Sequence, residues 1–218
     1  MFRRSFIARF GAAFGAGLPS AAQSSAITGW QPSRHEQDDW MDRVPGKHRF
    51  IFDTTTPAGL GAAILYANNY FIANQNAYGL PNSDLAVIIV ARHQSTAFAF
   101  NDSIWMKYGS TISQQINFTD PKTKQAPAAN LYNASGYGTT IENYGVTLES
   151  VLKRGVHLAV CQMASRALSG GIARATGGDT ERVYNELIAN VVTNSHMVPA
   201  GIVAVNRAQE RGYSFVRA

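Results

Sequence analysis

The chain contains a single cysteine, Cys161, in a sequence context that favours thiol chemistry. The apolar residues 156–160 before it predict a short buried strand, and residues 162–168 after it begin a pattern typical of a helix. Cys161 is therefore expected at a strand-to-helix corner, where the free backbone N–H groups of the helix N-terminus stabilise negative charge. Such a position favours the thiolate, which is the nucleophilic form of cysteine. The alternative is that Cys161 is buried and unreactive and packs as a small hydrophobe.

Further polar residues follow the other predicted strands. In an open parallel sheet, ligands bind outside the carboxyl ends of the strands, so residues at these ends are candidates for one common site. We expect Cys161 and His93 to be catalytic. The substrate-binding candidates are Arg92, Thr54, Thr55 and Pro199. Arg92 and His93 are expected to add positive charge, which favours a thiolate and an anionic sulfur donor.

Each of these neighbours also has an ordinary structural explanation. Asp53 and residues 54–56 can cap the helix that follows them. Arg92 can pair with a carboxylate, and His93 can face solvent. His157 lies within the strand before the cysteine, on the same face by two-residue alternation, and we expect it to be a buried histidine held by a hydrogen bond.

Apolar periodicity predicts alternating strands and helices over most of the chain. Residues 85–91 form a continuous apolar run, which is typical of a parallel sheet. The predicted strands are 48–53, 85–91, 156–160, 196–199 and 213–216. The predicted helices are 56–76, 96–108, 147–154, 162–171, 180–191 and 200–211. This alternation predicts an α/β fold with a mostly parallel sheet of about five strands and helices on both faces.

The chain divides into three predicted parts. Residues 1–26 look like a twin-arginine export signal: an arginine pair precedes a short apolar stretch, which is too short for a membrane anchor and ends in small residues. A mitochondrial transit peptide is the competing interpretation. Residues 27–47 are predicted to be an irregular arm outside the core, and residues 48–218 form the domain. Within the domain, residues 109–145 predict a long polar and aromatic insert: a lid, an oligomer contact, a folded-over loop or a mobile insertion.

Composition excludes several classes of function. The formal net charge is +5, from 19 basic and 14 acidic residues. Setting aside Arg3, Arg4 and Arg9 of the predicted signal leaves 16 basic against 14 acidic residues, so nucleic-acid binding is not expected. One cysteine excludes an intramolecular disulfide and cysteine-rich zinc or haem sites. The HExxH, P-loop and dinucleotide signatures are absent, so neither a metal nor a cofactor is expected.

The C-terminal third of the sequence resembles the DsrE/DsrF-like family of small sulfur-handling proteins. Three segments at a specific spacing carry this resemblance: 155–161, 198–203 and 209–216. The resemblance implies a flavodoxin-like α/β fold and assembly into homo- or hetero-oligomers. In some members a cysteine carries sulfur as a persulfide, and its position corresponds to Cys161.

The leading hypothesis is therefore a periplasmic protein that takes sulfur from a sulfane donor and passes it to a protein thiol acceptor. We expect a homo-oligomer with neither a nucleic-acid partner nor a stable membrane anchor. The alternative is a non-catalytic oligomeric binding or scaffold protein of the periplasm, with contacts from the insert and from Trp30 and Trp40 in the arm. A third possibility is the binding of a small anion or a flavin phosphate by residues 54–56 at a helix N-terminus.

Overall fold

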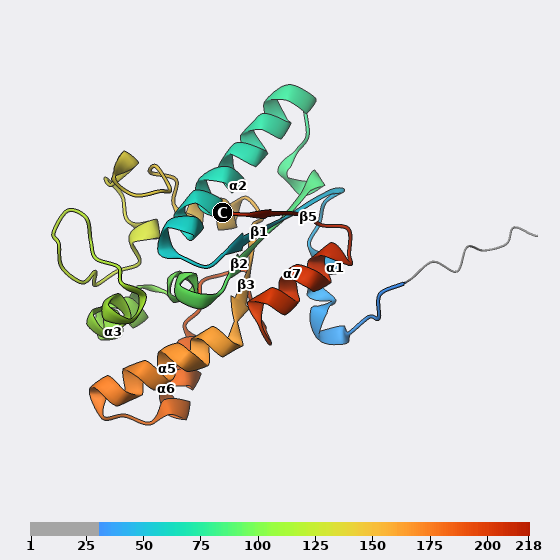
Figure 1. The fold of residues 1–218 in the computed structure, drawn as a ribbon. Helices are drawn as coiled ribbons and strands as arrows, with labels where there is room; N and C mark the ends of the chain where they lie inside the picture. The colour runs from blue at the N-terminus through green and yellow to red at the C-terminus, as the bar shows by residue number, and fades with distance from the viewer. Residues whose placement is uncertain (1–30) are drawn as a thin grey trace, which may run out of the picture. The chain divides into compact units, whose positions relative to one another are not determined.

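A five-stranded parallel sheet forms the centre of the protein, as a computed structural model describes it for residues 31–218. The strand order is β4-β3-β2-β1-β5, and every neighbouring pair is parallel. The strands are β1 (His48–Thr54), β2 (Leu85–Ala91), β3 (His157–Cys161), β4 (Ser195–Val198) and β5 (Ser214–Arg217). This sheet, with helices on both faces, confirms the predicted flavodoxin-like α/β class (Figure 1). The predicted export signal and Trp30 lie outside the described residues.

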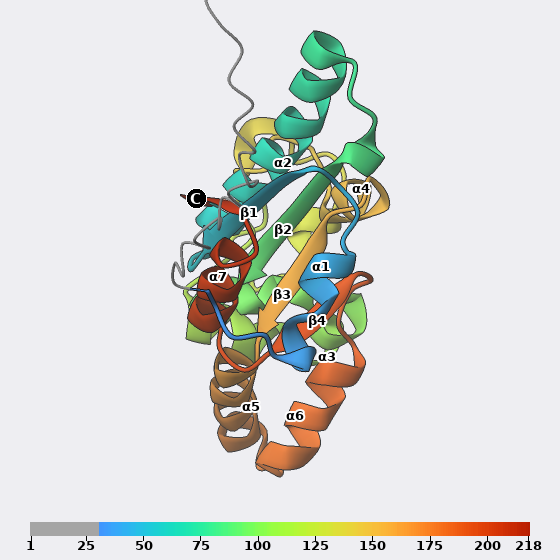
Figure 2. The same ribbon diagram turned by 90° about the vertical axis from the view of Figure 1, so that its right-hand side faces the viewer.

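Helices cover the two faces of the sheet unequally. The helices are α1 (Trp40–Arg43), α2 (Pro57–Tyr78), α3 (Asp102–Ile116), α4 (Leu148–Lys153), α5 (Gln162–Thr176), α6 (Thr180–Ala189) and α7 (Gly201–Gln209). Helices α2 to α6 pack on one face, whereas α1 and α7 pack on the other, which is the nearer face in Figure 2. Short 3₁₀ helices lie at Glu36–Asp38, Asn82–Asp84, His93–Ala99, Leu131–Asn133 and Gly138–Thr140. Within residues 31–218, no helix has the length and apolar character that a membrane span requires.

Burial on both faces explains the continuous apolar run of β2. Val87 and Ile89 pack among the side chains of the α2 face, whereas Ile88 and Val90 pack against the α7 face. Because side chains alternate along a strand, both sets must be apolar when both faces are covered.

The connections that follow β3 and β4 leave the sheet toward opposite faces. After β3 the chain enters α5, whose Leu168 and Ile172 join the core of the α2 face. After β4 it enters α7, whose Val205 joins the core of the other face, and then returns across the sheet to β5 beside β1. Two neighbouring strands whose connections diverge in this way form a topological switch point, which opens a crevice at the carboxyl edge of the sheet.

Part of the N-terminal arm belongs to the core, so the prediction of an irregular arm over 27–47 is wrong for residues 36–44. Helix α1 buries Trp40 and Met41 on the α7 face of the sheet. The hydroxyl of Tyr213 donates a hydrogen bond to the carbonyl of Met41 at 2.7 Å. Apolar burial of these few side chains outweighs the polar composition of the segment.

The insert is a loop folded over the domain, and it starts later than the predicted residue 109. Helix α3 begins after Asn101, whose side chain caps it, and continues through Gly109 to Ile116. A glycine is required at position 109 because the carbonyl of Pro127 in the folded-over loop occupies the space of a Cβ atom. The predicted helix over 96–108 is therefore displaced toward the C-terminus.

Helix α5 also extends beyond its predicted end at residue 171. Gly171 lies against the side chain of Gln115 in α3, at a separation that leaves no room for a Cβ atom. The glycine thus permits close packing of two helices, and the helix ends at Gly177, which has a left-handed φ of 68°.

Candidate functional site

Cys161 ends β3 and caps the N-terminus of α5, as its sequence context predicts. Its Sγ accepts a hydrogen bond from the backbone N–H of Ala164 at 3.4 Å, so sulfur takes the place of the oxygen that usually caps a helix. The hydroxyl of Ser165 donates to the Cys161 carbonyl at 2.9 Å, which fixes the corner. The residue is 6% exposed, so only a small part of it reaches the surface.

A pocket of about 300 Å³ opens beside Cys161 at the switch point between β3 and β4. Its walls come from the first turns of α5 and α7 and from the residues that follow β2. The residues that line it with Cys161 include Arg92, His93, Met163, Ala164, Ala167, Gly201 and Ile202. The structure therefore brings together Cys161, His93 and Arg92, three of the residues expected at a common site.

The N-terminus of α7 approaches this pocket closely because Gly201 has no side chain. A Cβ atom there would lie 2.5 Å from Cβ of Arg92 and 3.0 Å from Cγ1 of Val90. Among residues 31–218, no side chain caps the start of α7. Its first backbone N–H groups consequently contribute partial positive charge to the pocket that Gly201 and Ile202 line.

Arg92 is paired with a buried carboxylate and is not a free cation. Its Nε and one terminal nitrogen donate to the two carboxylate oxygens of Asp53, each at 2.7 Å. Asp53 is 3% exposed. Hydrogen bonding to Asp53 raises the pKa of Arg92 further above its usual value. The expectation that Arg92 supplies unbalanced positive charge is thus corrected, because a full negative charge lies directly against it.

His93 lies in the first residues after β2 with its side chain exposed. Its φ of 57° is in the left-handed region, which is uncommon for a residue other than glycine. The side chain lines the Cys161 pocket and a smaller pocket of about 180 Å³ that Gln94 and Gln115 also line. His93 therefore lies at the pocket of Cys161, and its predicted catalytic role stays a prediction.

Residues 54–56 form hydrogen bonds to backbone groups of neighbouring segments and do not line the pocket. Thr54 is fully buried, and its hydroxyl donates to the carbonyl of Val90 at 2.7 Å, so it is not accessible to a substrate. The carbonyl of Thr55 accepts a hydrogen bond from the backbone of Gln94 at 3.1 Å. The hydroxyl of Thr56 accepts from Gly59 N–H at 3.0 Å and caps α2. These bonds support the capping explanation over substrate or anion binding.

Sequence reasoning did not identify several residues that shape the pocket. Pro199 was predicted to bind substrate, but it is exposed beside the site and is not among the residues that line the pocket. Gly201 and Ile202, two and three residues later, form the wall instead. Met163, in the first turn of α5, also lines the pocket. Asp53 was expected to cap a helix and instead pairs with Arg92. In the parallel register of β1 and β2, Asp53 lies beside Val90, two residues before Arg92. This register brings the carboxylate and the guanidinium together.

A second polar cluster lies on the same face of β3 as Cys161. His157 is partly buried, and its Nδ1 lies 2.9 Å from Nε2 of His196, so the predicted hydrogen-bonded histidine is confirmed. The indole of Trp40 stacks on His196 with ring centroids 3.9 Å apart. Burial and the neighbouring His157 lower the pKa of His196 to about 4, and burial lowers the pKa of His157. In the described part of the chain, no group of three or more acidic, histidine or cysteine side chains is arranged to hold a metal.

Comparisons with known proteins do not assign a family. No family model matches the sequence, and no curated protein matches it. Among solved structures, the chain is similar to a protein of unknown function from Methanobacterium thermoautotrophicum, with a TM-score of 0.38 and 13% sequence identity. The match covers 79% of this chain and 100% of that chain. This similarity does not bear on function.

Proposed function

We propose that this protein binds sulfane sulfur as a persulfide on Cys161 and transfers it to the thiol of a partner protein. The main support is the placement of the single cysteine, which caps α5 and lines a pocket at the switch point of the sheet. The N-termini of α5 and α7 both stabilise negative charge there. The resemblance of the C-terminal third to the DsrE/DsrF-like family favours the same chemistry.

Both transfer steps use the same exchange reaction. In loading, the Cys161 thiolate attacks the outer sulfur of a donor R–S–SH. The donor S–S bond breaks, R–S⁻ leaves with the electron pair, and Cys161–S–SH forms. In delivery, a partner thiolate attacks the outer sulfur of Cys161–S–SH, and the Cys161 thiolate is the leaving group. A single thiol in this chain is sufficient for both steps.

The proposal also places the protein in the periplasm as a homo-oligomer without a stable membrane anchor. The sequence of residues 1–26 supports export, and the family resemblance supports assembly. The edge strand β5 leaves Phe215 and Val216 exposed, as expected of a surface that another subunit covers.

Persulfide formation on Cys161 is expected in the native protein. After incubation with an alkyl persulfide or inorganic polysulfide, intact-mass measurement should show a gain of whole sulfur atoms that a reductant reverses. Cys161→Ser should abolish the gain while keeping the fold, because its hydroxyl can still accept the Ala164 hydrogen bond. A thiol that gains no sulfur until the protein is unfolded would contradict the proposal.

A non-catalytic binding or scaffold protein is the second candidate, and the low exposure of Cys161 favours it. Of the tyrosines in the insert, which was predicted to supply contacts, Tyr132 is fully buried, whereas Tyr144 is 56% exposed. Under this candidate, Cys161→Ser leaves a phenotype of the host unchanged and Tyr144→Ala removes it. Under the persulfide proposal, the two substitutions have the opposite effects.

A further inference from the structure

The pocket beside Cys161 has an unusual balance of charge for a site that handles anionic sulfur compounds. Arg92 lines it, but both carboxylate oxygens of Asp53 accept hydrogen bonds from the guanidinium. Asp53 is almost completely buried, so solvent does not screen its charge as it would at the surface. The pair therefore contributes little net charge to the pocket.

The partial charges of the two helices are matched by the thiolate itself. Each helix N-terminus carries roughly half a positive charge, so α5 and α7 together balance one negative charge. The Cys161 thiolate supplies that charge, and its Sγ already accepts the hydrogen bond from Ala164. A second anion in the pocket would face the thiolate with no further positive charge from the two helices or from Arg92 to balance it.

The walls of the pocket are largely apolar. Met163 from α5 and Ile202 from α7 both line it and are 68% and 58% exposed. Ala164 and Ala167 add further apolar surface on the α5 side. A hydrocarbon group that covers these side chains removes apolar area from water, which favours binding.

We infer that the Cys161 pocket selects sulfur donors whose organic group R is uncharged and apolar, and that Asp53 sets this preference by neutralising Arg92. The inference rests on the proposed function and names its substrate class: organic persulfides R–S–SH in which R is an uncharged hydrocarbon group. The loading step is the exchange described above, with this R–S⁻ as the leaving group. Asp53 acts through Arg92 and is a specificity residue, not a catalytic one.

Three methanethiosulfonates that differ in one substituent test the charge preference directly. They carry an ethyl, a sulfonatoethyl or a trimethylammonioethyl group. With each, the Cys161 thiolate attacks the sulfenyl sulfur, methanesulfinate leaves, and the group is added through a disulfide. Each rate is divided by the rate of the same reagent with mercaptoethanol. We expect the normalised rate of the ethyl reagent to exceed that of the sulfonatoethyl reagent by about fivefold.

Two variants separate the charge effect from accessibility. Asp53→Asn leaves Arg92 unbalanced, so the ethyl-to-sulfonatoethyl ratio should fall by about fivefold. Asp53→Asn combined with Arg92→Met removes both charges, and the ratio should return to that of the unmodified protein. Because each ratio compares reagents of similar size on one variant, a change in the exposure of the thiol cancels.

The outcomes distinguish the inference from the proposed function. A sulfonatoethyl reagent that reacts as fast as the ethyl reagent, or a ratio that Asp53→Asn leaves unchanged, overturns the inference while persulfide formation stands. Failure of all three reagents with the native protein overturns both. As a check with sulfur donors, mass measurement should show faster loading from an alkyl persulfide than from thiosulfate.

Discussion

Replacing Tyr132 by alanine is expected to lower the free energy of unfolding by about 3 to 5 kcal/mol. Tyr132 lies in the folded-over loop and is fully buried against the domain. Its ring packs on Phe98 with centroids 4.7 Å apart, and its hydroxyl donates to the Pro57 carbonyl at 2.5 Å. Burial and nearby Glu142 raise the pKa of Tyr132, so the hydroxyl keeps its proton and its role as donor. The substitution removes both the ring and this bond to α2.

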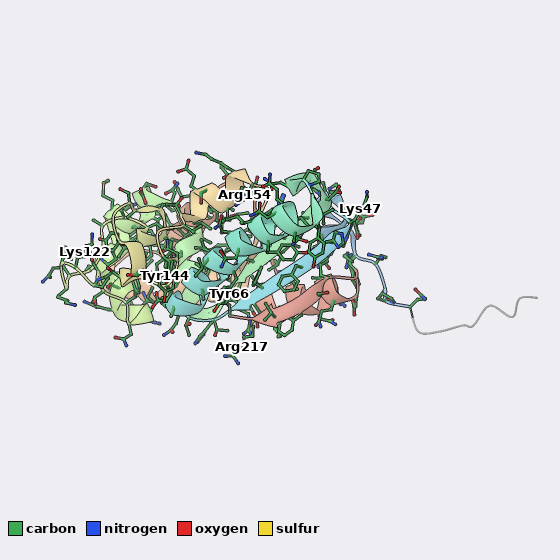
Figure 3. The ribbon with its side chains drawn as sticks, turned by 90° about the horizontal axis from the view of Figure 1, so that it is seen from above. Lys47, Tyr66, Lys122, Tyr144, Arg154 and Arg217 are labelled. Carbon is green, nitrogen blue, oxygen red and sulfur yellow. The ribbon has the colours of Figure 1, made fainter. Side chains whose placement is uncertain are left out.

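Chemical denaturation and limited proteolysis together measure this effect. Tyr132→Phe keeps the ring and should cost only about 1 to 2 kcal/mol, for the unpaired Pro57 carbonyl. Tyr144→Ala changes an exposed tyrosine of the same insert and should stay within about 0.5 kcal/mol of the unmodified protein. Trypsin should cut Tyr132→Ala more rapidly after Lys122, which lies at the insert end of the domain in Figure 3. An unchanged unfolding midpoint for Tyr132→Ala would show that the insert is not part of the cooperative core.

The second large effect is a loss of stability in mild acid that originates at His196. The pKa of this residue falls from 6.5 to about 4 on folding, mainly because of burial, with smaller contributions from His157 and Arg43. Above pH 6.5 the histidine is neutral in both states and has no effect. Between these values the unfolded chain binds a proton that the folded protein does not, so stability falls as the pH falls. The loss amounts to about 2 kcal/mol after allowance for partial exposure.

Unfolding measured as a function of pH identifies the residue responsible. His196→Gln should reduce the slope of the profile through this range, because the amide does not titrate and can still pair with His157. The lowered pKa of His157 leaves a smaller loss in the variant. His48→Gln removes an exposed histidine and should leave the acid loss in place. Folding lowers the pKa of Asp120 and Glu186 from their ordinary values of 3.8 and 4.5, so their contributions are lost at lower pH. If His196→Gln keeps the full slope above pH 4.5, the assignment to His196 is wrong.

The sequence predicted one part of the Cys161 site, the residues that follow the strands, but not the wall that α7 contributes. Apolar runs give the strands, and the polar residues that follow them are placed at one edge because all the strands are parallel. Cys161, Arg92 and His93 were found in this way. The wall formed by Gly201 and Ile202 was not, because it depends on α7 crossing the opposite face of the sheet after β4.

The sequence by itself determined most of the strands and helices of this protein, since hydrophobic periodicity and helix caps act over a few residues. It placed the cysteine at a strand-to-helix corner and predicted an α/β fold. Tertiary structure alone decided which residues meet across elements: Asp53 with Arg92, and Trp40 with His196. The contact between Trp40 and His196 joins residues 156 positions apart along the chain. They follow from strand order and the packing of helices on each face, which no local pattern encodes.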